Sequence, residues 1–139
     1  MIVPGEWYAY NDGVVHARVL AVNAAQFDVA FLLDTGADVT TFSAADLGQL
    51  ALPHRPSQAR VSGVGGAAAV VAVDTTLYLP TDAGRPAAVG GTFAAFTDPF
   101  ALDMSVLGRD VLDNFAAVVD RPGDFVALIR GNHGYRVVS

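Results

Sequence analysis

An apolar segment ends abruptly in two acids at Phe31-Leu32-Leu33-Asp34-Thr35-Gly36-Ala37-Asp38. Asp, Thr and Gly are common turn residues, so one interpretation is a strand that leaves the core and turns. The other is a catalytic carboxylate at a strand exit, because a carboxylate can take a proton from water or give one to a substrate. Both interpretations place Asp34 at the end of a strand.

Catalysis by carboxylates needs an ionised and a protonated group, and two close carboxylates that share one proton supply both. Asp38 is too near Asp34 in sequence to face it across a bound water, and Asp110 lacks the Thr-Gly turn. A twofold axis places identical residues opposite each other. The economical pair is therefore Asp34 from each of two copies, which predicts a homodimer.

The composition indicates a folded, single-domain protein over residues 1–139. Hydrophobic residues make up 53% of the chain and charged residues 16%, and a chain of this length buries roughly two-thirds of its unfolded surface. The net charge of −6, with eight scattered arginines as the only cationic residues, disfavours nucleic acid as a partner. Apolar runs such as Ala67–Val73 are far shorter than the roughly 20 residues of a membrane helix, and no signal peptide is recognisable, so we expect a cytoplasmic protein without a membrane partner.

Metal and thiol chemistry find no support in the sequence. The chain has no cysteine, which excludes disulfides, a thiol nucleophile and thiolate ligands. Its histidines, His16, His54 and His133, are far apart and lack the spacing of metal ligands. We expect them to have solvated or hydrogen-bonded surface roles.

Strand signals dominate the chain, and the two expected helices are short. Ser43 has the features of a helix N-cap, with Asp46 three positions later. Gly65-Gly66 is typical of a hairpin tip, and Gly90-Gly91 is expected to interrupt a strand. The expected strands are 14–22, 26–33, 39–42, 59–64, 67–79, 86–96, 115–120 and 125–130, and the expected helices are 44–50 and 109–114. This pattern favours a mostly β barrel-like or sandwich domain.

Three segments resemble the motifs of retropepsin-like aspartic proteases. Leu33-Asp34-Thr35-Gly36-Ala37-Asp38-Val39-Thr40 is similar to the active-site signature of that family. Ser62-Gly63-Val64-Gly65-Gly66 resembles its glycine-rich flap, and Val106-Leu107-Gly108-Arg109-Asp110-Val111-Leu112 resembles the stretch that precedes its C-terminal helix. The order and spacing agree with the family from about Val14 to Phe115.

The resemblance implies a mostly β, closed retropepsin-like barrel (the acid protease fold) with a flap hairpin and one or two short helices. It implies an aspartic endopeptidase that acts on extended polypeptides as a homodimer, with one catalytic Asp per chain, a shared water and no metal or cofactor. Two alternatives stay open: a catalytically silent peptide-binding module of the same fold, and a dimerisation module.

The resemblance also assigns roles to single residues. Asp34, Thr35 and Gly36 would form the catalytic turn, with the Thr35 hydroxyl bonded across the dimer axis and the Gly36 carbonyl accepting from substrate. Thr40 and Arg109 would support the site, and Arg109 and Asp38 would form a buried or half-buried ion pair unless both are solvated charges. The expected substrate-binding residues are Ala37, Asp38, Gly63, Val64, Gly65 and Val106, with apolar pockets lined by Val39, Val64, Val106 and Leu107.

The chain departs from the viral members of the family after the second helix. About twenty-five residues remain there, and the hairpin 115–130 resembles the longer domains of cellular proteins. Either Ile2–Tyr10 or Tyr135–Val138 could supply the interface strands. Trp7, Tyr8 and Tyr10 could pack at that interface or anchor the end of the barrel.

Overall fold

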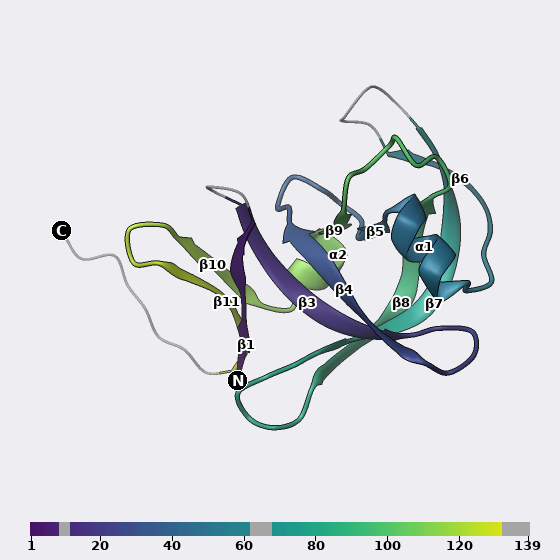
Figure 1. Ribbon diagram of the computed structural model, residues 1–139. Helices are drawn as coiled ribbons and strands as arrows, with labels where there is room; N and C mark the ends of the chain where they lie inside the picture. Colours follow the sequence, from purple (N-terminus) through teal and green to yellow (C-terminus); the bar gives the residue numbers. More distant parts are fainter. Residues whose placement is uncertain (9–11, 62–67, 132–139) are drawn as a thin grey trace.

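The computed structural model describes residues 1–8, 12–61 and 68–131, which form eleven strands and two short helices (Figure 1). No helical stretch among these residues has the length and apolarity needed to cross a bilayer. In chain order the elements are β1 (Ile2–Pro4), β2 (Glu6–Tyr8), β3 (Asp12–Leu20), β4 (Gln26–Leu33), β5 (Thr41–Phe42), α1 (Ala44–Leu50), β6 (Arg55–Val61), β7 (Ala68–Leu79), β8 (Ala87–Phe96), β9 (Ser105–Leu107), α2 (Arg109–Leu112), β10 (Ala116–Asp120) and β11 (Phe125–Ile129).

The larger sheet closes on itself. Its strand order is β2-β3-β4-β9-β5-β8-β7-β6, and an additional pairing of β3 with β7, at Arg18 and Tyr78, joins the two ends of the run β3-β4-β9-β5-β8-β7. Closure removes the exposed edges of these strands. The predicted mostly β closed barrel is confirmed.

The second sheet has the order β1-β11-β10 and is antiparallel throughout. It joins the start of the described chain to its last strands, so the segment Ile2–Pro4 is paired within its own chain. The tip of its β10–β11 hairpin is held to β2, because Trp7 Nε1 donates to Asp124 Oδ1 at 2.7 Å and Arg121 lies 4.6 Å from the Trp7 ring centre. Trp7 thus anchors a hairpin, while Tyr8 is exposed and Tyr10 lies outside the described residues.

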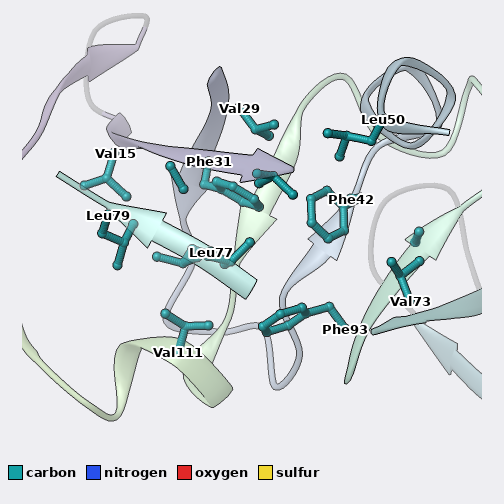
Figure 2. Close-up of a cluster of buried hydrophobic side chains, with 14 of the residues drawn as sticks. Val15, Val29, Phe31, Phe42, Leu50, Val73, Leu77, Leu79, Phe93 and Val111 are labelled. Carbon is teal, nitrogen blue, oxygen red and sulfur yellow. The ribbon is translucent and has the colours of Figure 1, made fainter. Parts of the chain in front are cut away.

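Alternating apolar side chains build the barrel core. Along β3 every second residue from Val15 to Val19 is fully buried, as expected for a strand with one face toward a core. The ring of Phe42 packs edge to face on two others (Figure 2). Its centre lies 5.6 Å from that of Phe31 and 6.4 Å from that of Phe93. Burying each such side chain contributes about 1.5–3 kcal/mol to stability. Phe31 thereby holds the strand that leads into Asp34.

The predicted helix 44–50 is confirmed, with the Asp46 N–H donating to Ser43 Oγ at 3.2 Å. The second helix ends at Leu112, two residues earlier than expected.

The prediction that Gly90-Gly91 interrupts its strand is wrong, because β8 runs through both glycines and pairs with β7 along its whole length. A methyl group on Gly90 would lie 3.1 Å from Thr76 Oγ1, so glycine permits close packing there. Pro56 lies within β6, at the edge of the sheet where proline is tolerated.

Candidate active site

Asp34 follows the last residue of β4 and begins a tight turn. Its N–H donates to the Leu107 carbonyl at 3.1 Å, which continues the parallel pairing of β4 with β9. Its Oδ1 accepts the Gly36 N–H at 3.0 Å, and its carbonyl accepts the Ala37 N–H at 3.2 Å. The Asp34 side chain is half-buried. Asp34 therefore is both a turn residue and a partly exposed carboxylate at a strand exit.

The rest of this loop is held by the junction between β9 and α2. The Arg109 N–H donates to the Ala37 carbonyl at 2.8 Å, and the Asp110 N–H donates to the Asp38 carbonyl at 3.2 Å. β9 lies between β4 and β5 in the sheet, so the loop that connects those two strands passes over the end of β9. The Asp-Thr-Gly and Leu-Gly-Arg segments, far apart in sequence, therefore form one structural unit.

Gly108 allows the two segments to meet. A methyl group at this position would lie 2.6 Å from the carbonyl carbon of Val39 and 2.8 Å from the Thr40 nitrogen. Neither is the end of a flexible side chain, so the backbone would have to move. Gly108 therefore fixes the approach of β9 to the Asp34 loop.

Thr40 and Asp110 form a hydrogen-bonded centre beneath the loop. Thr40 is fully buried, and its N–H and hydroxyl donate to the same Asp110 Oδ1 at 2.9 and 2.7 Å. The Val111 N–H donates to that oxygen at 2.9 Å, while Thr40 Oγ1 accepts the Gly108 N–H at 3.0 Å. Thr40, one of the two residues predicted to support the site, thus connects the loop to the start of α2. The partner role of Asp110 was not predicted, although an acid directly after Gly-Arg was its signal in the sequence.

Arg109 and Asp38 form the expected ion pair, but the expectation that it is buried or half-buried is wrong. The two side chains are 53% and 76% exposed. Both residues lie on the outer surface, where the loop meets the first turn of α2. An ion pair this exposed contributes little to stability.

The remaining predicted site residues differ in their exposure to solvent. Thr35 and Gly36 are exposed at the loop, Ala37 is half-buried and Val106 is 9% exposed. Leu107 is fully buried in the main core, so the expectation that it lines a substrate pocket is wrong, whereas Val39 is 39% exposed. Successive strand residues point to opposite faces, which separates Val106 from Leu107. Gly63, Val64 and Gly65 lie outside the described residues.

A second network, not predicted, ties β9 to α1. Ser105 Oγ donates to Asp46 Oδ2 at 2.5 Å and accepts the Ser43 N–H at 2.9 Å. Ser43 and Ser105 are both buried. Asp46, at the start of α1, thus holds the first residue of the strand that underlies the Asp34 loop.

The hairpin of β6 and β7 is braced on its surface. Arg55 Nη1 and Nη2 donate to Asp74 Oδ2 and Oδ1 at 2.5 and 3.3 Å, and Thr92 Oγ1 donates to Asp74 Oδ1 at 2.5 Å. The hydrogen bonds from Arg55, with a contribution from Thr92, hold the pKa of Asp74 below its usual value. These contacts join β6, β7 and β8.

No group of three His, Cys, Asp or Glu side chains among the described residues could hold a metal ion.

A cleft of about 460 Å³ lies at the other end of β4 from Asp34, and its lining includes Arg18, Gln26, Tyr78 and Thr81. Because Gln26 begins β4 and Asp34 follows its end, the cleft is separate from the Asp34 loop.

No family model matches the chain, and no curated protein matches it. Solved structures do. A retropepsin-like aspartic protease from Rickettsia conorii aligns over 92% of this chain and 88% of its own, with a TM-score of 0.62 and 16% identity. The chain has the retropepsin fold. The protease of EIAV, solved with an inhibitor, aligns over 70% of this chain and 84% of its own, with a TM-score of 0.51 and 24% identity. The resemblance to retropepsins drawn from the motifs is confirmed at the level of the fold.

Proposed function

We propose that this protein is an aspartic endopeptidase that cleaves extended polypeptides as a homodimer. The observation that carries the proposal is the placement of Asp34. Within the retropepsin fold, it stands half-buried at the exit of β4, on a loop fixed by Gly108, Thr40 and Asp110. A carboxylate held this firmly is prepared for chemistry at one position.

The neighbouring acids do not serve as its partner within one chain. Asp38 pairs with Arg109, and one oxygen of Asp110 accepts three hydrogen bonds from Thr40 and Val111. The second carboxylate is therefore Asp34 of the other copy. Two carboxylates that meet at a twofold axis would share one proton, because like charges at short range are not both ionised.

The proton shared by the two carboxylates supports hydrolysis in a simple sequence. The ionised Asp34 takes a proton from the bound water as the water oxygen attacks the peptide carbonyl carbon. The protonated Asp34 of the other copy gives its proton to the carbonyl oxygen, which forms a tetrahedral diol. Proton transfer to the amide nitrogen then breaks the C–N bond and leaves a carboxylic acid and an amine.

We assign the catalytic turn to Asp34, Thr35 and Gly36, and contacts with the substrate to Ala37 and Asp38 beside it. The carbonyls of Ala37 and Asp38 already accept from Arg109 and Asp110, so Gly36 is the loop residue whose carbonyl we assign to the substrate. The β6–β7 hairpin is proposed as the flap, with Gly63, Val64 and Gly65 covering an extended peptide, and Val106 as an apolar wall of the binding site.

Cleavage of a mixed peptide library from acidic to neutral pH tests the proposal, with Asp34→Asn beside the wild type. We expect the substitution to remove activity by at least about 100-fold, since general acid–base catalysis contributes about 10²–10⁴-fold. The amide oxygen of Asn can still accept the Gly36 N–H, so the fold should survive, as circular dichroism would verify.

Asp113→Asn, which changes an exposed acid outside the loop, is the matched control and should cleave like the wild type. If neither the wild type nor the Asp34 variant cleaves, while both are folded and dimeric, the protein is instead a peptide-binding module.

A further inference from the structure

The cleft at the far end of β4 lies where the barrel closes. There β3 and β7 pair through a single pair of residues, Arg18 and Tyr78. Residues opposite each other in antiparallel strands share a face, and Arg18 is exposed, so both side chains lie on the outer face of the barrel. Both line the cleft, whose volume of about 460 Å³ is typical of sites that hold small molecules.

The turn between β7 and β8 forms a fixed wall of this cleft. Thr81 Oγ1 donates to the Arg85 carbonyl at 2.5 Å and accepts the Ala83 N–H at 3.2 Å. The turn is also held to β1, because the Ile2 N–H donates to Asp82 Oδ1 at 2.8 Å and the Asp82 N–H donates to the Ile2 carbonyl at 2.9 Å. A wall that is already ordered loses little entropy when a ligand binds.

The polar side chains that line the cleft are available to a ligand. Within the described part of the chain, the Arg18 guanidinium forms no ion pair or hydrogen bond, and neither the Tyr78 hydroxyl nor the Gln26 amide forms a hydrogen bond. Asp28 lies opposite Arg18 on β4, but its Oδ2 is 2.7 Å from His16 Nδ1. The cleft therefore offers one cation and two further hydrogen-bonding groups.

Apolar side chains supply other parts of the lining, among them Leu20, Pro80 and Pro86. Leu20 is 39% exposed at the end of β3, and both prolines are exposed. The fixed φ angle of proline keeps the two rings in place. An apolar ligand body in the cleft would remove this surface from water, which favours binding.

We propose that this cleft binds a monocarboxylate joined to an apolar body. A guanidinium presents paired N–H donors that match the two oxygens of a carboxylate. Arg18 is the only charged residue that lines the cleft among those described, and the chain carries −6, so a single negative charge is favoured over a dianion. A free small acid and the C-terminal residue of a peptide share this chemistry. Asp34 takes no part, so the inference is independent of the proposed protease activity.

Binding to the full chain can be measured with N-acetylphenylalanine, its amide and inorganic phosphate, with backbone amide NMR signals as the readout. The acid should shift the signals of Gln26, Thr81 and Gly84, which line the cleft, in a saturable manner. The amide should bind at least about tenfold more weakly, because it lacks the charge-assisted hydrogen bonds. Phosphate should also bind more weakly than the acid.

Substitution of Arg18 tests the assigned contact. Arg18→Gln should raise the dissociation constant of the acid at least about tenfold. Arg85→Gln is the matched control, because it removes the same charge from an exposed position in the neighbouring turn that does not line the cleft, and it should bind like the wild type. Arg18→Lys keeps the charge without the paired donors and should bind with intermediate affinity. It carries the test if circular dichroism shows that Arg18→Gln is unfolded.

A peptide that ends in phenylalanine, with a free or an amidated C-terminus, separates the two sources of the ligand. The Asp34→Asn chain is used here so that the peptide stays intact. Binding of the free-carboxylate peptide in the cleft supports the proposal and identifies chain ends as ligands. Binding of N-acetylphenylalanine without the peptide also supports it and restricts the ligand to small acids.

Other outcomes overturn the inference. They are the absence of saturable shifts with the acid, equal or tighter binding of the amide or phosphate, and equal weakening by Arg18→Gln and Arg85→Gln. Shifts confined to the Asp34 loop mean that the acid binds as a cleavage product would, which overturns the cleft and leaves the protease proposal intact. A chain that binds the acid in the cleft but cleaves no peptide overturns the protease proposal alone.

Discussion

At the scale of single residues, Thr40 holds the Asp34 loop through one buried hydroxyl. Thr40→Val keeps the shape of the side chain but removes the donor to Asp110 and the acceptor for the Gly108 N–H. The Gly108 N–H is then buried without its partner, so we expect the free energy of unfolding to fall by about 1–3 kcal/mol. Peptide cleavage should fall as well, because the loop loses its support.

Denaturant unfolding measures the first effect, and Thr40→Ser, which retains the hydroxyl, should recover most of the hydrogen bonding. A valine variant as stable as the wild type would show that the hydroxyl does not stabilise the loop.

The sequence identified many of these residues but not their connections. Asp34, Gly36, Thr40 and Arg109 could be chosen from their motifs. The acid after Gly-Arg marked Asp110 in the sequence, but its hydrogen bonds with Thr40 depend on two segments, seventy positions apart, being placed within hydrogen-bond distance. The exposure of the Arg109–Asp38 pair likewise depends on where the barrel surface lies.

At the scale of the elements, His16 joins three neighbouring strands. Its Nε2 lies 2.5 Å from Glu6 Oε1 on β2, and its Nδ1 lies 2.7 Å from Asp28 Oδ2 on β4. The hydrogen bond with Glu6 raises the pKa of His16 above its usual value, with help from Asp28 and against partial burial. The charged form is thus favoured in the folded state.

A raised folded-state pKa stabilises the fold at low pH. The contribution is fully present below the unfolded value near 6.5 and is lost as the pH rises through the raised folded value. Because His16 is partly exposed, we expect a magnitude of about 0.2–1 kcal/mol.

Unfolding free energies across this pH range should lose that component in His16→Gln and retain it in His54→Gln, a variant of an exposed histidine whose Nδ1 lies 3.3 Å from the Leu52 carbonyl oxygen. An unchanged pH profile in the His16 variant contradicts the assignment.

Several elements followed from local pattern, as β4 and α1 illustrate. The span 26–33 alternates toward an apolar end, and Ser43 caps the following helix, so both were predicted with their observed bounds. The continuous β8 was not, because glycine weakens a strand by itself, whereas close packing against Thr76 on β7 favours it.

At the scale of the whole molecule, charge opposes self-association. Each chain carries −6, so a dimer brings −6 and −6 together as −12. Salt screens exposed charges, with a Debye length of about 30 Å at 0.01 M and about 8 Å at 0.15 M. We therefore expect the association constant to rise several-fold between these concentrations.

Sedimentation equilibrium at a series of NaCl concentrations measures the association constant. An association constant that falls with added salt would instead mean that complementary charges join the two copies.

The sequence by itself determined the mostly β class and the position of Asp34 at a strand exit, because these depend on local periodicity and turn residues. Tertiary structure alone decided that β9 lies between β4 and β5, that Leu107 belongs to the core, and that β1 pairs with β11 in a second sheet. Such features arise from pairings between distant segments, whose free energy depends on the whole packed barrel.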